Sequence, residues 1–354
     1  MLKKSVKTIL NGLSVAVFVI DADKIIRFGN NAAIARFDAN LKDQPLSSFV
    51  PADECLDAAS QVLENKTDTV SLELTLQDVV PTTYRLIITR LDAERTGTDA
   101  RAIISLEDIS HIREAEQMRI DFVANVSHEL RSPLTSLSGF IETLQGPAKN
   151  DPVAQERFLA LMAGDAQRMS RLIGDLLSLA KLQAKERIPP SNTVDLSSIL
   201  RRVTASLEPL SKRENTDLSL TISPDLPLVT GDADELTQVF QNLIENGVKY
   251  SPQNTVVEVI AEPDPSHINQ VRISVKDHGD GLDPLHIPRL TERFYRVDKG
   301  RSRTMGGTGL GLAIVKHILI RHRAYLHIDS QVGIGSNFAV FLPIATRNRS
   351  ADKH

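Results

Sequence analysis

Residues 122–144 read FVANVSHELRSPLTSLSGFIETL and decide how the middle of the chain folds. Their heptad-like spacing places the apolar side chains on one face of a helix and predicts that this face packs against other helices. We call these side chains the seam: Phe122, Val126, Leu130, Pro133, Leu137, Ile141 and Leu144. Because Pro133 lies inside the predicted helix, we expect it to bend or loosen one turn.

A second helical run follows a break. Residues 146–152, GPAKNDP, end the first helix, and Asp151 followed by Pro152 suits the start of the next one. The apolar residues of the second run are Met162, Met169, Leu172, Leu176 and Leu179. Two such helices form an antiparallel hairpin that leaves its apolar face in water, whereas two hairpins paired into a four-helix bundle bury it. The pattern therefore predicts a homodimer.

Residues 1–109 are predicted to form a smaller α+β domain. Strands are expected at 15–20, 25–28, 70–76, 84–89 and 102–106, with a helix at 30–37. The opening, a hydrophobic strand, Asp21-Ala-Asp, a second strand and Asn30-Asn-Ala, resembles a PAS sensor domain. No His precedes His111, and Cys55, the single Cys of the chain, fits no flavin-adduct pattern, so we expect neither haem nor flavin.

The C-terminal part mixes helical and strand periods and predicts an α/β sandwich. Residues 188–192, IPPSN, form a stiff linker. Helices are expected at 196–214, 233–250 and 309–323, and strands at 218–222, 255–261, 271–277, 325–329 and 338–342. The predicted domains are 1–109, 110–187 and 192–346, with a polar tail at 347–354.

The composition of the 354 residues, 41% hydrophobic and 24% charged, is that of a folded protein. A net charge of -4, the absence of Trp and only 4% aromatic residues argue against direct nucleic-acid binding. No run of about 20 apolar residues occurs, so we expect no membrane span in this chain. We expect a cytoplasmic protein, held at the inner membrane if a longer natural form has an anchor upstream of Met1.

His128 lies beside the seam, so its ring should reach the flank of the helix that faces solvent. A neutral imidazole is nucleophilic, and the adjacent Glu129 could orient the ring and act as a base. A His standing alone on such a helix is more simply explained as a polar flank residue.

Residues 242–246 read NLIEN and place Asn242 and Asn246 on one helix face, with Lys249 and Tyr250 following. Side-chain amide oxygens suit Mg²⁺, which takes few protein ligands and keeps waters and substrate phosphates. Either Asn alone is better explained as an ordinary residue of a helix surface.

Two glycine-rich strings lie further on. Asp277-His-Gly-Asp-Gly281 follows a predicted strand; its glycines let the backbone approach a flat ligand, and Asp277 can accept a hydrogen bond, although such a string alone is more simply explained as a turn. Residues 306–313, GGTGLGLA, open a predicted helix whose free N–H groups and dipole suit phosphates. The segment between the strings, which we call the lid, carries Arg289, Arg293, Arg296, Lys299, Arg301 and Arg303.

Together with residues 293–298, RFYRVD, these strings occur in the order of the five sequence boxes of sensor histidine kinases, and residues 120–344 resemble that family. The resemblance implies an ATP-binding domain of the GHKL type that uses ATP and Mg²⁺. Asn246 would be the direct Mg²⁺ ligand, and Asn242 would assist it. The residues expected to bind the nucleotide are Asn242, Asn246, Lys249, Tyr250, Asp277, Gly279, Gly281, Arg296, Gly307, Gly309 and Gly311.

The resemblance also implies that His128 takes the γ-phosphoryl group from ATP and passes it to an aspartate of a response regulator. Ser132 stands where the family commonly has Thr or Asn, so we expect weak phosphatase activity toward the regulator. Residues 287–298 and 313–322 are most similar to phosphate-regulon sensor kinases, which suggests phosphate-starvation signalling. The alternative is a GHKL-type ATPase or ATP-gated scaffold that forms no phosphohistidine.

Overall fold

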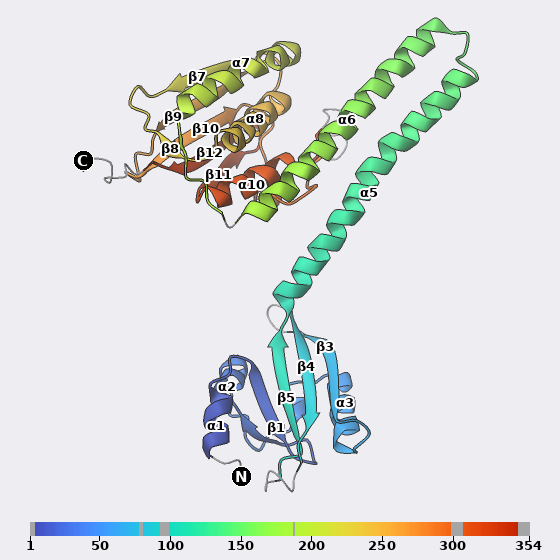
Figure 1. The fold of residues 1–354 in the computed structure, drawn as a ribbon, viewed down its shortest axis with the longest axis vertical. Coiled ribbons are helices and arrows are strands. Elements are labelled where there is room, and N and C mark those ends of the chain that lie inside the picture. The colour runs from blue at the N-terminus through green and yellow to red at the C-terminus, as the bar shows by residue number, and fades with distance from the viewer. Residues whose placement is uncertain (1–3, 78–80, 93–98, 187, 299–306, 346–354) are drawn as a thin grey trace, which may run out of the picture. The chain divides into compact units, whose positions relative to one another are not determined.

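The computed structural model describes residues 4–77, 81–92, 99–186, 188–298 and 307–345 (Figure 1). The chain divides into two compact units, Met1–Val123 and Ala124–His354. The lid cations Lys299, Arg301 and Arg303, the glycine at 306 and the polar tail at 347–354 lie outside the described residues. In the part of the chain that is described, no helix is both long and apolar enough to cross a membrane.

The first unit contains a five-stranded antiparallel sheet in the order β2-β1-β5-β4-β3. Its strands are β1 (Ala16–Ile20), β2 (Ile26–Gly29), β3 (Thr69–Leu76), β4 (Thr82–Arg90) and β5 (Ala102–Asp108). Its helices are α1 (Lys4–Asn11), α2 (Asn31–Phe37) and α3 (Asp53–Leu63). Asn30 begins α2, because its side chain accepts a hydrogen bond from the backbone N–H of Ala33. The predicted α+β organisation is therefore present, whereas α1 and α3 are not among the predicted elements.

The core of this unit lies between the sheet and the helices. Phe18 and Ile20 of β1 are fully buried with Leu86 of β4 and Ile104 of β5. Cys55 on α3 belongs to the same core, and burial raises the pKa of its thiol to about 11. Cys55 is therefore a packing residue whose thiol stays protonated at neutral pH.

The predicted hairpin consists of α5 (Ser110–Gln145) and α6 (Pro152–Lys185). The side chain of Asp151 accepts hydrogen bonds from the first N–H groups of α6, which explains where that helix begins. Phe140 and Phe158 pack across the hairpin with their ring centroids 5.4 Å apart. α5 continues as a helix through Pro133.

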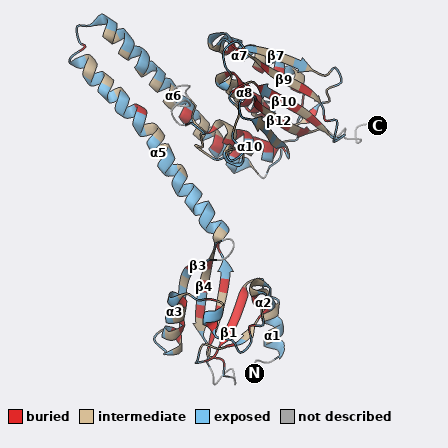
Figure 2. Ribbon diagram, turned by 180° about the vertical axis from the view of Figure 1, so that it is seen from behind, coloured by how far each residue is buried: buried red, intermediate tan, exposed pale blue. Residues whose placement is uncertain are grey.

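The seam is only partly covered by its own chain (Figure 2). Pro133 is its one buried member, and Ile141 keeps 43% of its surface exposed. Other exposed apolar side chains of the hairpin include Leu134, Leu159, Leu161, Ile173 and Leu177. By contrast, Leu172, Leu179 and Leu182 of α6 are buried. Apolar surface of this extent on a hairpin is typical of a helix pair that needs a partner.

The C-terminal part of the second unit is a sandwich of helices on a sheet (Figure 1). The sheet has the order β11-β12-β10-β9-β7, with β7 parallel to β9 and the other pairs antiparallel. Its strands are β7 (Asp217–Ile222), β9 (Val256–Pro263), β10 (Gln270–Asp277), β11 (Tyr325–Gln331) and β12 (Gly335–Pro343). A short ladder pairs β6 (Thr193–Val194) with β8 (Val229–Thr230).

Three helices pack on this sheet: α7 (Leu196–Glu214), α8 (Ala233–Tyr250) and α10 (Gly311–Arg321). α7 and α8 begin and end where the sequence predicts, and α10 is two residues shorter at each end. α8 lies so close to the sheet that a Cβ added at Gly247 would be 3.0 Å from a methyl group of Val257. α10 also packs against α6, which brings the sandwich onto the hairpin within this unit.

Candidate functional site

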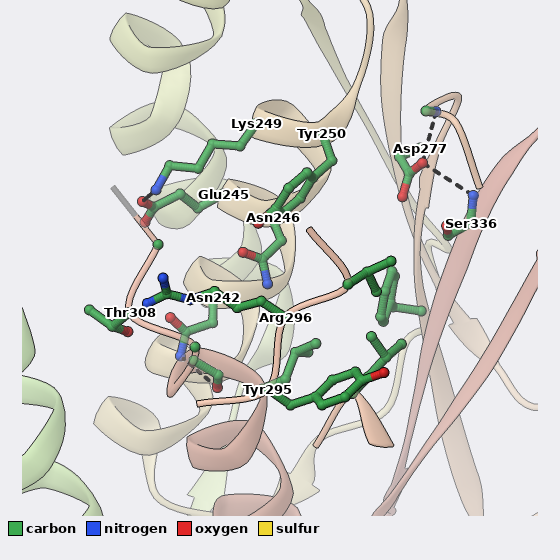
Figure 3. Close-up of a pocket in the computed structure, with 18 of the residues that line it drawn as sticks. Asn242, Glu245, Asn246, Lys249, Tyr250, Asp277, Tyr295, Arg296, Thr308 and Ser336 are labelled. Atoms are coloured by element: carbon green, nitrogen blue, oxygen red, sulfur yellow. Dashed lines mark hydrogen bonds and ion pairs between the residues drawn. The ribbon is translucent and has the colours of Figure 1, made fainter. Parts of the chain in front are cut away.

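A cavity of about 610 Å³ lies beside α8 (Figure 3). The side of α8 opposite the cavity is buried and carries Leu236, Val239, Phe240, Leu243, Ile244 and Val248. The other walls come from the chain that follows β10, from the start of α10 and from α6. The amphipathic pattern of α8 therefore fixes which of its polar residues reach the cavity.

The polar residues of α8 line the cavity at helical spacing. Asn242, Asn246, Lys249 and Tyr250 are all lining residues, as the sequence predicts. The side-chain amide of Asn242 donates to the carbonyl oxygen of Gly311, at 3.4 Å, which ties α8 to the start of α10. The Lys249 ammonium lies 2.6 Å from a carboxylate oxygen of Glu245 and is 13% exposed. Lys249 is thus held in place by a neighbour on its own helix.

Asp277 ends β10 at the far wall of the cavity and is 6% exposed. Its Oδ1 accepts hydrogen bonds from the backbone N–H groups of Gly279, at 2.9 Å, and Ser336, at 3.1 Å. Burial raises the pKa of the Asp277 carboxyl, and these two hydrogen bonds partly offset the rise. The carboxylate is thereby fixed as a directed acceptor at this wall.

Gly279 and Gly281 line the cavity where side chains would not fit. A Cβ at Gly279 would lie 2.6 Å from the carbonyl oxygen of Tyr250. Gly281 has a positive φ of 65°, and a Cβ there would lie 2.0 Å from the carbonyl oxygen of Gln331. Glycine is required at both positions because backbone from another segment takes the space of a side chain.

Three glycines form the opposite wall: Gly307 and Gly309 in the loop before α10, and Gly311 at its first position. Gly309 has a φ of 73°, and a Cβ there would lie 2.9 Å from Cα of Phe294. The N–H of Phe294 also donates to the carbonyl oxygen of Gly309, at 2.8 Å, so the chain at Phe294 is hydrogen-bonded to the glycine-rich loop before α10. The first N–H groups of α10 are available at the cavity, as in anion sites at helix starts.

Arg296 reaches across the cavity from the lid (Figure 3). Its side chain is 6% exposed, and burial lowers its pKa. One terminal nitrogen lies 3.4 Å from a carboxylate oxygen of Glu129, and Nε is buried with no hydrogen-bond partner among the described residues. Of the other described lid cations, Arg289 is paired with Glu292 at 3.2 Å, and neither Arg289 nor Arg293 lines the cavity.

His128 and Ser132 lie on α5 and are both exposed, as expected for the flank of a helix. Glu129 is 17% exposed and is held by two guanidinium groups. The guanidinium of Arg168 on α6 lies 2.7 Å from the Glu129 carboxylate, and that of Arg296 in the lid lies 3.4 Å from it. The residue next to His128 is therefore in direct contact with a residue of the cavity wall.

Several lining residues are absent from the sequence-based prediction, among them Arg171, Asp175, Glu245, Tyr295, Thr308 and Ser336. Glu245 could have been found from its position three residues after Asn242 on the same helix face. Thr308 lies between predicted glycines, and its hydroxyl donates to Asp175 of α6 at 2.7 Å. No sequence signal identifies Arg171 and Asp175, because they reach the cavity only through the packing of the sandwich on α6.

These residues suit a nucleotide carrying Mg²⁺. The volume lies within the range of small-molecule sites, which is about 300–1,000 Å³. Asp277 offers a fixed acceptor for an amino group at one wall, and the start of α10 offers N–H donors for phosphates at another. Asn242 and Asn246 supply amide groups between these walls, and the unpartnered Nε of Arg296 is a further donor.

Comparison with protein families gives two matches along the chain. Residues 118–185 match the His Kinase A (phospho-acceptor) domain. Residues 231–346 match the family described as histidine kinase-, DNA gyrase B-, and HSP90-like ATPase. The first match contains His128, and the second contains every predicted nucleotide-binding residue.

Similar proteins are sensor kinases. The phosphate regulon sensor protein PhoR of Pseudomonas aeruginosa is 43% identical over 256 residues, which cover 71% of this chain and 56% of PhoR. The sensor-like histidine kinase SenX3 of Mycolicibacterium smegmatis is 38% identical over 70% of this chain and 64% of its own length. The sensor protein kinase WalK of Staphylococcus aureus is 31% identical over 96% of this chain and 55% of WalK. This chain therefore spans between about half and two thirds of each relative.

Among solved structures, the histidine kinase ThkA in complex with response regulator protein TrrA shares the fold. The match covers 95% of this chain and 98% of the other, with a TM-score of 0.52 and 20% sequence identity. The first domain match lies on the hairpin, and the second lies on the sandwich. With a phospho-acceptor domain followed by a GHKL-type ATPase domain, the chain belongs to the sensor histidine kinases.

Proposed function

We propose that this protein is an ATP-dependent histidine kinase that phosphorylates itself on His128 and then phosphorylates a response regulator. The observation that carries the proposal is the contact of Glu129 with Arg296, at 3.4 Å. It joins the residue next to the phosphoacceptor to the wall of the nucleotide cavity. In-line transfer requires the phosphoryl acceptor to reach the bound nucleotide, and this contact brings the helix that carries His128 beside the cavity.

In the proposed complex, adenine lies at Asp277 and the phosphates extend toward Gly307, Gly309 and Gly311. Bound Mg²⁺ would neutralise charge on the phosphate oxygens, with Asn246 as its direct ligand and Asn242 beside it. Lys249 contacts phosphate from α8. The positions of these side chains in the cavity wall support the assignments, which come from the resemblance to the family.

The transfer step forms one bond and breaks one. A ring nitrogen of neutral His128 attacks the γ-phosphorus while the bond from that phosphorus to the bridging oxygen of ADP breaks. As the N–P bond forms, the proton on the second ring nitrogen passes to a base, a role that we assign to Glu129 because it is adjacent in sequence. Because Arg168 and Arg296 both hold Glu129 in this structure, Arg296 must turn from Glu129 to the phosphates before Glu129 can serve His128.

The experiment that tests the kinase against the ATPase alternative follows the γ-phosphate. The purified chain is incubated with γ-labelled ATP and Mg²⁺, and both retained label and released phosphate are measured. A kinase retains label that is labile to acid and stable to base, as a phosphoramidate is. Release of phosphate with no label on the chain would instead establish a GHKL-type ATPase.

We also propose that the active form is a homodimer in which two hairpins bury the exposed seam. Ile141→Glu should convert the protein to monomers, because a charge would have to be buried in an apolar bundle at a cost of several kcal/mol. Val153→Glu is the matched control, since Val153 is 79% exposed in the first turn of α6, where an acidic residue is favourable. Light scattering should give a dimer for wild type and control. A wild-type monomer at micromolar concentration would contradict the bundle.

We further propose that the chain dephosphorylates its regulator weakly through Ser132. Ser132 lies four residues after His128 on one helix face, so its hydroxyl can hold the water that attacks the aspartyl phosphate. Ser132→Thr should raise dephosphorylation of the purified regulator severalfold, because the added methyl restricts χ1 of the hydroxyl. Ser132→Ala should abolish it and leave self-labelling intact. Equal rates for Ser132→Ala and wild type would remove this role.

We also propose the boundaries of three domains and the kind of signal that the protein serves. Residues 1–109 would form a PAS-like sensor domain, 110–187 the dimerisation and phosphotransfer domain, and 192–346 the catalytic domain. The first unit supports the sensor assignment through its antiparallel sheet with helices inserted between β2 and β3. Similarity to the phosphate regulon sensor protein PhoR supports a role in phosphate signalling.

A further inference from the structure

The face of α6 that meets the catalytic domain carries Arg168, Arg171, Asp175 and Ser178, spaced three, four and three residues apart. Asp175 accepts the hydrogen bond from Thr308 at 2.7 Å, and Ser178 is 3.1 Å from the side chain of Gln238 on α8. Arg168 is linked to the catalytic domain indirectly, because it pairs with Glu129, which also contacts Arg296. The hairpin is therefore one wall of the nucleotide cavity, and the glycine-rich loop is fastened to it at Thr308.

The described charged residues that line the cavity are of both signs. Among the described lining residues, the carboxylates are Asp175, Glu245, Asp277, Asp280 and Asp298, and the cations are Arg171, Lys249 and Arg296. Among these described side chains, carboxylates outnumber cations before any metal ion binds. Each cation that is free to contact phosphate should have a large effect on affinity.

Two of the three cations already have partners. Lys249 pairs with Glu245 at 2.6 Å, and Arg296 pairs with Glu129 at 3.4 Å. Arg171 is exposed at the cavity and makes no ion pair within 4.0 Å with any residue that the structure describes. Asp175 lies one turn along α6, and its pKa is raised by burial and lowered in part by Arg171. A guanidinium in this position can bind phosphate oxygens through two N–H groups at once.

We propose that Arg171 of the hairpin contacts the phosphate groups of the bound nucleotide, so that the nucleotide site is shared between the catalytic domain and α6. The inference rests on the proposed function. Nucleotide and α6 then bind the catalytic domain cooperatively: the triphosphate stabilises packing on the hairpin, and that packing tightens triphosphate binding by the same factor.

Calorimetric titration of the full chain tests the proposal with two probes, the non-hydrolysable analogue AMP-PNP with Mg²⁺ and adenosine alone. All measurements use the His128→Gln background, so that no transfer can occur. Arg171→Ala should weaken AMP-PNP about 10-fold and leave adenosine unchanged, because a lost hydrogen-bonded charge pair affects only the phosphates. Arg171→Lys should fall between Arg171→Ala and the background. Arg157→Ala is the matched control, since it removes an exposed arginine from α6 that does not line the cavity.

The outcomes separate this inference from the proposed function. Equal AMP-PNP affinity of Arg171→Ala and the background overturns the inference while leaving the kinase assignment intact. Equal losses for AMP-PNP and adenosine also overturn it, because Arg171 would then support the shape of the cavity and not the phosphates. A His128→Gln chain that binds neither probe overturns the proposed nucleotide site itself.

Discussion

Replacement of His128 by Gln should eliminate self-labelling from γ-labelled ATP. Glutamine keeps a polar side chain at an exposed helix position but has no nitrogen nucleophilic enough to form a stable phosphoramidate. Nucleotide affinity should stay as in wild type, because His128 is not among the residues that line the cavity. Labelling after gel separation and calorimetric titration with AMP-PNP give the two readings.

Ser127→Ala provides a control for this variant, since it changes the neighbouring exposed residue on α5 and should retain label. A His128→Gln chain that labels at the wild-type rate would show that another side chain accepts the phosphate. A chain that loses label together with nucleotide binding would show that His128 supports the site and is not simply its acceptor.

Substitution of Gly281 by Ala should strongly impair the catalytic domain. Its Cβ would lie 2.0 Å from the carbonyl oxygen of Gln331, so the loop that lines the cavity after Asp277 must move away from β11. A displacement of this kind at a binding site lowers the rate of transfer by on the order of 100-fold. AMP-PNP titration and the initial rate of labelling measure the loss.

Gly333→Ala separates the steric effect from the backbone effect. Gly333 also has a positive φ, 79°, but a Cβ there would meet nothing within 4 Å. It should cost about 1 kcal/mol of stability, the strain of an L residue in this conformation, and leave labelling unchanged. If Gly281→Ala behaves like Gly333→Ala, the close approach of Gln331 does not shape the site.

Much of the catalytic domain could be predicted because its signals are local. α7 and α8 begin where the sequence predicts, since Asp195 and Asp232 cap their starts and their apolar residues recur at helical spacing. α10 starts later than predicted, because Gly309 adopts a positive φ and remains in the loop. In the first unit, α3 was not predicted, although Asp53 and Glu54 in its first turn are a helix-start signal.

The composition of the cavity wall could be predicted only in part. Asn242, Asn246 and Asp277 belong to recognisable strings, and all three line the cavity. The contacts of Glu129 with Arg296 and of Thr308 with Asp175 join residues 167 and 133 positions apart. Periodicity and spacing describe one element at a time, so they carry no information on which face of α6 the sandwich contacts.

The most direct test of the central claim is to locate the phosphate on the chain. After incubation with Mg²⁺ and ATP, the wild-type protein is digested at neutral pH and the peptides are analysed by tandem mass spectrometry without acid treatment. We expect one phosphorylated residue, His128, with the modification lost on brief exposure to acid. Phosphate found on a Ser, Thr or other His residue, with His128 unmodified, would contradict it.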